Sequence, residues 1–313
     1  MSEKRLYYGG QAVMEGVMIR GPRSMAIACR KPDGDIAVRQ QELGGLYAGP
    51  LRRFPFVRGV IVLWETLVLG TRALIWSSNV AMGVEEKESD SAPMLAIALL
   101  SLIVVGGIFF AGPLLLADLL RGGVDNGTLV VIAEGLIRLL IIIAYVSVIG
   151  LLPDVRRVYE YHGAEHKSIH ALESGDPLET ASVQQHPTAH VRCGTSFLLT
   201  VVIVSVVVFA AVGSPDLWLR VVSRVVLIPV IASISYELIR LGGAFEHNPV
   251  TRVLMWPNLA LQAITTKPCD ESQVEVALAA LKEVLAAEAE LEITAPKLAA
   301  TADAAAKTAP PLD

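Results

Sequence analysis

Long charge-free runs dominate the hydrophobic pattern in the middle of the chain. The first, MLAIALLSLIVVGGIFFAGPLLLADLL, has no charged residue before Asp118, and three later runs are bounded by Gly, Pro or charged residues. An apolar helix of about 20 residues crosses the roughly 30 Å hydrocarbon core of a bilayer. Four transmembrane helices are therefore predicted, over residues 94–120, 128–152, 195–213 and 217–241.

The segment that precedes the first run is apolar but carries a narrow polar stripe. In residues 51–83, four polar side chains recur every seven residues among Val, Leu, Ile and Trp; they are Arg58, Glu65, Arg72 and Asn79. This spacing places them on one side of a helix. The helix is expected to lie in the membrane interface or to pack on the bundle with its polar stripe toward water. The alternative is a re-entrant helix that lines a cavity.

Alternating hydrophobic and polar positions near the N-terminus indicate strands. The stretch MAIACRKPDGDIAVRQ alternates on both sides of Pro32-Asp33-Gly34, which favours a tight turn between antiparallel strands. Upstream, GGQAVMEGVMIRGP has glycines that suit strand ends and turns, and it matches neither a Walker loop nor a dinucleotide-binding GxGxxG motif. Residues 1–50 are therefore predicted to form a small cytoplasmic β-element.

Helical spacing returns after the last apolar run. Apolar positions from Val274 to Leu285 follow the period of a soluble amphipathic helix, so residues 242–285 are predicted to be a cytoplasmic helical region. From Ala286 onward, Ala, Glu, Lys, Thr and Pro dominate, and few side chains are available for burial. Residues 286–313 are therefore predicted to be a disordered tail.

The composition agrees with a membrane-embedded chain. Of 313 residues, 53% are hydrophobic and 18% are charged, and the mean hydropathy is +0.53. The predicted fold class is mainly α, a polytopic membrane protein with about four transmembrane helices, an amphipathic or re-entrant helix and a small N-terminal β-element. The lipid bilayer is the expected partner. A net charge of −5 provides no basic surface for nucleic acid, and the three widely spaced cysteines provide no disulfide framework.

Basic residues are concentrated between the second and third runs. Residues 153–194 contain Arg156, Arg157, Lys167 and Arg192, whereas the two short connections hold at most one basic residue. By the positive-inside rule this segment is cytoplasmic, and an even number of spans places both termini on the same side. The N-terminus, MSEKRLYYGG, lacks the pattern of a signal peptide. The predicted location is the inner, cytoplasmic membrane.

Four charged residues lie inside the predicted spans and form two pairs with i,i+4 spacing. The pairs are Glu134 with Arg138 in the second span and Arg220 with Arg224 in the fourth. An unpaired charge in hydrocarbon is costly, so such residues face a partner or a water-filled cavity. The expectation is an ion-pair network across the two spans. The alternative is a polar path for an ion or a lipid headgroup.

The residues with the clearest chemistry follow the second run directly. One helix is predicted over Val155–Glu173, because the preceding Pro-Asp is a helix-start signal and the following SGDP is a stop signal. It contains HGAEH, which satisfies the HxxEH pattern. His162 and His166 can bind one divalent metal, zinc being the expected ion, while Glu165 serves as general base. Five of the six histidines fall within residues 153–194, which favours a ligand set over a solvated helix face.

The third metal ligand is open between two residues. His190 is preferred because it lies at the entrance of the third span, and Glu173, further along the same helix, is the other candidate. His170 and His186 are expected to be surface residues. Cys193 is a soft candidate ligand, but a small buried residue is the role favoured for it.

Four stretches of the chain resemble the YqhQ-like family of integral membrane proteins. They are YYGGQAVMEGVMIRGP, EYHGAEHKSIHALESGDP, HVRCGTSF and ITTKPCDESQVEVALAALK, and the resemblance extends from about Tyr7 to Leu285. The family is of unknown function and is described as predicted metal-dependent enzymes, so the resemblance implies a membrane location and a metal but no substrate. Val191 stands where relatives tend to have proline, and Cys269 stands where an acidic residue is usual.

Two classes of function fit these patterns. The first is an integral-membrane metal-dependent hydrolase with a zinc site at the cytoplasmic membrane face. The second is a non-catalytic transporter or assembly factor, in which the polar pairs matter and the histidines are structural or sense a metal. HxxEH favours the first, and no GxSxG nucleophile motif competes with it. The pattern does not distinguish a peptidase from a lipid or phosphoester hydrolase.

Overall fold

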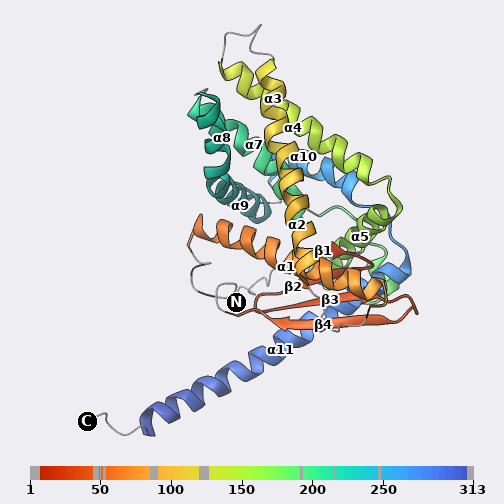
Figure 1. Ribbon diagram of the computed structural model, residues 1–313. Coiled ribbons are helices and arrows are strands. Elements are labelled where there is room, and N and C mark those ends of the chain that lie inside the picture. The colour runs from red at the N-terminus through yellow and green to blue at the C-terminus, as the bar shows by residue number, and fades with distance from the viewer. Residues whose placement is uncertain are drawn as a thin grey trace.

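The computed structural model describes residues 8–44, 49, 51, 54–84, 91–119, 127–190, 193–213, 216–245 and 248–308. Figure 1 shows two parts, a group of apolar helices and, below it, a small sheet covered by helices. The chain is mainly helical, and the sheet lies near its N-terminus. The predicted fold class is confirmed at this level.

The sheet is an antiparallel meander of four strands. Its order is β1-β2-β3-β4, with bounds Gly9–Val13, Gly16–Arg20, Ser24–Arg30 and Ile36–Glu42. The predicted turn joins β3 to β4, and Gly34 adopts a φ of +95° there, which a side chain would disfavour. The predicted β-element is thus present, and it includes the glycine-containing stretch upstream.

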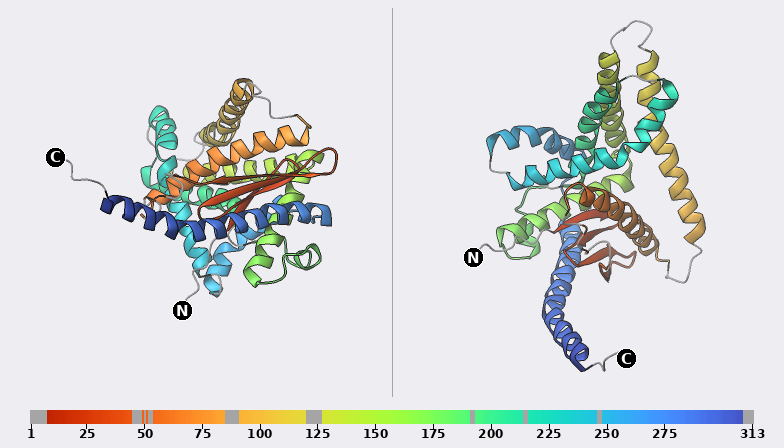
Figure 2. Two further views of the ribbon diagram at one scale, coloured as in Figure 1. Left: turned by 90° about the horizontal axis from the view of Figure 1, so that it is seen from below. Right: turned by 90° about the vertical axis from the view of Figure 1, so that its left-hand side faces the viewer.

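Both faces of the sheet are buried at β2 and β3, whereas β4 is largely exposed, and alternating side chains of β2 divide between the two faces. Val17 and Ile19 of β2 pack with α5 (Pro153–Ser174) and α11 (Glu271–Thr308). Met18, between them, packs on the other face with Leu69 and Ala73 of α1 (Val57–Ala81). Successive residues of a strand point to opposite faces, so β2 joins two separate hydrophobic clusters. Figure 2 shows α1 and α11 on opposite sides of the sheet.

Helix α1 lies between the sheet and α9 (Ile228–Ala244). Its polar stripe faces water only in part: Arg72 is exposed, whereas Arg58 forms an ion pair with Glu237 and the buried Glu65 forms one with Arg20. These partners come from distant parts of the chain, so the sequence period alone could not identify them. The alternative interpretation fits better in one respect, since this helix does line a cavity.

Among the described residues, three helical segments are long and apolar enough to cross a membrane, or four if a bent pair is one span. They are Val57–Ala81, Leu99–Leu119 and Leu129–Ile149, with Trp218–Val226 and Ile228–Ala244 as the bent pair. Helix α7 (Gly194–Val212) is a shorter apolar helix beside them. The segment over residues 51–83 is therefore as apolar as a span, although the sequence predicted an interfacial or re-entrant helix.

The last predicted span, residues 217–241, is broken rather than continuous. Helix α8 (Leu217–Val226) ends before Leu227, and α9 continues at an angle of 45°. Pro229 lies in the first turn of α9. Proline has no N–H to donate and its ring displaces the carbonyl of the preceding turn, which accounts for the bend.

The first predicted span contains a π-helical turn, Gly107–Ala111, between α2 (Ser91–Gly106) and α3 (Gly112–Leu119). Pro113 follows this turn and cannot donate to the carbonyl of Phe109, four residues earlier. Arg138 supplies the missing donor through its Nε atom, 3.1 Å from the Phe109 oxygen. A side chain of a neighbouring helix thus satisfies a backbone group in an apolar region.

The intramembrane charges form the expected ion pairs. Glu134 of α4 (Gly127–Ile149) accepts hydrogen bonds from Arg138 at 2.8 Å and from Arg224 of α8 at 2.7 Å, and all three residues are buried. Arg220 pairs with Asp118 at 3.1 Å. The prediction that these charges connect the second and fourth runs is confirmed, which favours the structural interpretation over a polar path.

The C-terminal helix continues beyond the predicted start of the disordered tail. Helix α11 extends to Thr308, and residues 309–313 lie outside the described residues. Ala, Glu and Lys are strong helix formers, so a segment with little to bury can still extend an existing helix. Glu288, within this part of the helix, is buried, and its carboxylate accepts hydrogen bonds from the backbone N–H groups of Arg23 and Ser24.

Candidate metal centre

Helix α5 carries the HxxEH pattern, and its bounds, Pro153–Ser174, agree with the predicted Val155–Glu173 to within two residues. Pro153 occupies the first turn, and Gly175 closes the helix in the left-handed conformation with φ of +74°. The helix follows α4 after a short turn, so it starts at the end of an apolar helix. Its buried face includes His162, Glu165 and His166.

Gly163, inside the HGAEH sequence, allows another part of the chain to approach α5 closely. A Cβ atom built at Gly163 would lie 2.3 Å from the carbonyl oxygen of Lys267. The Lys267 N–H donates to the Tyr159 carbonyl at 3.0 Å, which holds this segment against α5. The segment follows α10 (Pro249–Thr265), so the end of α10 lies beside the histidines.

Each histidine of the pattern has its Nδ1 atom against a backbone carbonyl. His162 Nδ1 is 2.9 Å from the Thr265 oxygen, and His166 Nδ1 is 2.5 Å from the Thr188 oxygen. Such contacts fix the tautomer that carries the proton on Nδ1 and leaves Nε2 with a lone pair. The Nε2 atom of His166 is buried without a hydrogen-bond partner among the described residues.

Cys193 is the third residue that the structure brings to this point. Its Sγ atom lies 3.1 Å from His162 Nε2, and one ligand atom from each of His162, His166 and Cys193 fits within 4.8 Å of the others. All three residues are buried. Nitrogen and thiolate donors in a set of three suit Zn²⁺, with a fourth position open. Cys193 is thus buried, as the sequence favoured, and its sulfur also lies within reach of both histidines.

The two residues that the sequence proposed as third ligand lie together, but in another group. His190 Nε2 is 3.1 Å from an oxygen of Glu173, and these two form a set with His170. The ring centroids of His166 and His190 are 5.8 Å apart. Val191 and Arg192, between His190 and Cys193, lie outside the described residues.

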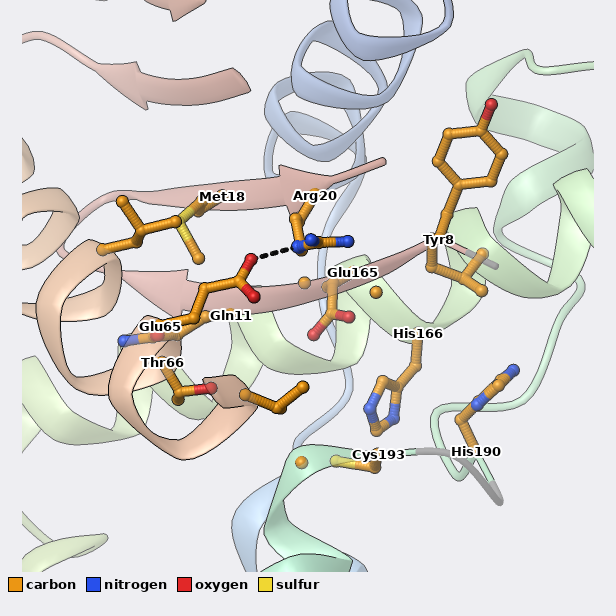
Figure 3. Close-up of a pocket in the computed structure, with 16 residues that line it drawn as sticks. Tyr8, Gln11, Met18, Arg20, Glu65, Thr66, Glu165, His166, His190 and Cys193 are labelled. Atoms are coloured by element: carbon orange, nitrogen blue, oxygen red, sulfur yellow. Dashed lines mark hydrogen bonds and ion pairs between the residues drawn. The ribbon is translucent and has the colours of Figure 1, made fainter. Parts of the chain in front are cut away.

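The histidine site opens on a cavity of about 220 Å³ between the sheet, α1 and α5. Figure 3 shows Glu165, His166 and Cys193 on one side of this cavity, with Glu65 and Arg20 opposite them. His190 also lines it, whereas His162 is not among the lining residues. The cavity therefore adjoins two of the three candidate ligands, His166 and Cys193.

Glu165 is buried beside the histidines and faces this cavity. Burial raises the pKa of its carboxyl, although His162, His190 and a hydrogen bond from the Gly10 backbone partly oppose that shift. Gly10 is needed for the contact, because a Cβ there would lie 2.8 Å from Glu165 Oε1. A carboxyl with a raised pKa accepts and releases a proton closer to neutral pH.

Sequence reasoning missed the groups that hold the site from outside α5. The Thr188 and Thr265 carbonyls, Gly10 and the Arg20–Glu65 pair come from five other segments, and no local pattern marks them. For Cys193 a signal existed, namely a cysteine between a histidine and the start of an apolar helix. That signal could not be separated from the ordinary burial of cysteine.

These features define a class of multi-pass membrane protein in which a small antiparallel sheet and a histidine-bearing helix enclose a cavity beside apolar helices. Within that class, the chain belongs to the family described as protein of unknown function (DUF1385), which matches residues 54–287. The chain is similar to "Uncharacterized protein YqhQ" of Bacillus subtilis (strain 168), with 35% identity over 296 residues that cover 90% of this chain and 93% of the relative. The resemblance predicted from the motifs is confirmed. No solved structure matches the chain.

Proposed function

We propose that this protein is a membrane-embedded, metal-dependent hydrolase that binds zinc through His162, His166 and Cys193. One observation carries the proposal: both imidazoles place Nδ1 on a backbone carbonyl, which turns His162 Nε2 toward the Cys193 sulfur and leaves His166 Nε2 buried without a hydrogen-bond partner among the described residues. This arrangement is typical of metal-binding histidines, whose second nitrogen is held by the protein. A buried imidazole nitrogen without a partner is otherwise costly.

The proposed mechanism assigns separate roles to the zinc ion, Glu165 and Gly10. When bound, zinc supplies a Lewis acid with one open coordination position. Glu165 is proposed as general base, because it lies next to His166 in the chain and shares the same cavity. The Gly10 N–H donates a hydrogen bond to the Glu165 carboxyl, and burial raises the pKa of that carboxyl.

The proposed location follows from the charges of the connecting segments. We infer that α2–α3, α4, α7 and the α8–α9 pair cross the inner, cytoplasmic membrane, with the histidine site and both termini on the cytoplasmic side. Arg156, Arg157 and Lys167 on α5 support this orientation through the positive-inside rule. The alternative function, a transporter, draws its support from intramembrane charges, and these pair with one another here.

The test is metal content measured by mass spectrometry on the detergent-purified full chain after zinc addition and desalting. Wild type should hold stoichiometric zinc at this site, and His162→Ala, His166→Ala and Cys193→Ser should each lose it. Glu165→Gln should keep the zinc but lose hydrolysis of ester, amide and phosphoester probes, because it removes only the proton acceptor. His186→Ala is the matched control, since His186 pairs with Asp176 and lies outside the set. A folded wild type in which these three substitutions change no metal content would overturn the proposal.

A further inference from the structure

A second group of potential ligands lies beside the first and shares no residue with it. One ligand atom from each of His170, Glu173 and His190 lies within 4.8 Å of the others. His170 and Glu173 are three residues apart on α5, so they project from the same side of the helix. His190 reaches them from the segment that precedes α7. The ring centroids of His170 and His190 are 4.5 Å apart.

The backbone of His190 is held in place by a buried glutamine. The His190 N–H donates to Gln262 Oε1 at 2.8 Å, and Gln262 Nε2 donates back to the His190 carbonyl at 2.9 Å. Gln262 is fully buried in α10. This pair of hydrogen bonds fixes the position from which the imidazole projects, so its contact with Glu173 is preorganised rather than a chance surface pairing.

A backbone carbonyl orients the ring of His170, as it does the rings of the histidines in the first group. Its Nε2 atom lies 2.8 Å from the Ala189 carbonyl, which leaves Nδ1 as the nitrogen available to a ligand. The segment over residues 188–190 therefore supplies a carbonyl to His166, a carbonyl to His170 and the side chain of His190. Both groups are assembled against one short stretch of chain.

We propose that His170, Glu173 and His190 bind a second divalent metal ion adjacent to the first site. Two imidazoles and one carboxylate form a set that suits Zn²⁺, Mn²⁺, Fe²⁺ or Co²⁺. Because it contains no sulfur, its donor atoms are harder, in the hard–soft acid–base sense, than those of the set that contains Cys193. Glu173 is exposed, so this site keeps contact with solvent while His190 is buried. Neighbouring metal ions are a common arrangement in hydrolytic centres, and in that respect the inference extends the proposed function.

Cobalt substitution distinguishes the two sites, because Co²⁺ bound to a thiolate has a near-ultraviolet charge-transfer band that nitrogen and oxygen ligands do not produce. The full chain in detergent is titrated with Co²⁺, and both the bound metal and this band are measured. Wild type should bind two equivalents and show the band. Glu173→Gln and His170→Ala should bind one equivalent and keep the band, whereas Cys193→Ser should lose it. His186→Ala, which removes a ring stacked 6.3 Å from His170 but outside the group, should behave as wild type.

The outcomes separate this inference from the proposed function. One equivalent with the thiolate band, unchanged by Glu173→Gln and His170→Ala, would overturn the second site and leave the first intact. If wild type binds one equivalent of Co²⁺ without the thiolate band, and Glu173→Gln no longer binds that equivalent, the second site is supported and the first is contradicted. If His170→Ala fails to fold, Glu173→Gln decides alone, because that side chain is exposed and its shape is preserved.

Discussion

At the scale of single residues, the glycine inside HGAEH matters as much as the histidines that flank it. A metal-binding pattern is defined by the side chains that act as ligands, but Gly163 contributes because it has no side chain. The absence of a side chain lets the Lys267 carbonyl approach α5. The same segment contains Thr265, two residues before Lys267, whose carbonyl contacts His162 Nδ1. The orientation of a candidate ligand thus depends on a missing methyl group.

Gly163→Ala is therefore expected to weaken both the fold and the site. The new Cβ would lie 2.3 Å from the Lys267 oxygen, and overpacking of this kind costs about 1–3 kcal/mol. Zinc retention should fall with stability, because the Thr265 carbonyl moves away from His162. Gly106→Ala is the matched control, since a Cβ at that helical glycine of α2 meets nothing within 4 Å and the residue lies outside the site. Thermal unfolding and zinc content are measured together, and equal behaviour of the two variants would contradict the prediction.

At the scale of elements, α11 is attached to the sheet by one carboxylate as well as by its apolar face. Glu288 Oε1 accepts from the N–H groups of Arg23 and Ser24 at 2.7 Å each and from the Ser24 hydroxyl at 2.8 Å. Burial opposes ionisation of Glu288, but these donors outweigh it and lower the pKa of the carboxyl. The ionised form is therefore the one that joins helix to sheet.

Glu288→Ala should destabilise the chain near neutral pH by about 1.5–3 kcal/mol, the usual contribution of hydrogen bonds to a charged group. Because the folded pKa lies below the unfolded value of about 4.3, the contribution is complete above that pH. It is lost as the pH falls through the folded pKa. Denaturant unfolding at pH 7 and pH 3 measures this, and the difference from wild type should shrink at pH 3. Glu283→Ala, at an exposed position of the same helix, should show neither effect.

At the scale of the whole molecule, the ion pairs that join α3, α4 and α8 lie at the opposite end of the apolar helices from the histidine site. Asp118 and Arg220 pair near the C-terminal end of α3, whereas α5 begins at the other end of α4. Figure 1 shows the sheet, α5 and α11 on one side of the apolar helices. A bilayer around those helices would leave the cavity-forming elements together on a single membrane face.

The proposed topology predicts opposite labelling of two exposed positions. Asp176→Cys, after α5, should be protected from a membrane-impermeant maleimide in intact cells and labelled only after lysis. Asp216→Cys, between α7 and α8, should be labelled in intact cells. The unsubstituted chain provides the background, because its cysteines are buried or half-buried. Labelling of Asp176→Cys in intact cells would place the histidine site outside and contradict the proposal.

Features encoded within a few neighbouring residues could be predicted from the sequence. The limits of α5 follow from a proline, a glycine and the stop signal around them, and the i,i+4 spacing places His162 and His166 together on any helix. Hydropathy likewise predicted the apolar helices, and alternation predicted the β3–β4 hairpin. The bend at Pro229 shows the limit of hydropathy, which measures apolar length but not the path of the backbone.

Only the tertiary structure decided which groups complete the candidate site. Thr265 is 103 residues from His162, and Cys193 is 31 residues from it, so their meeting depends on how α10 and α7 pack against α5. His190 and Glu173 were recognised as candidate ligands by type, but their grouping with His170 depends on the loop held by Gln262. Sequence determined the local chemistry, because backbone propensity and side-chain spacing act over a few residues. The ligand sets form only when segments that are distant in the sequence pack together, and that packing decides which atoms face one another.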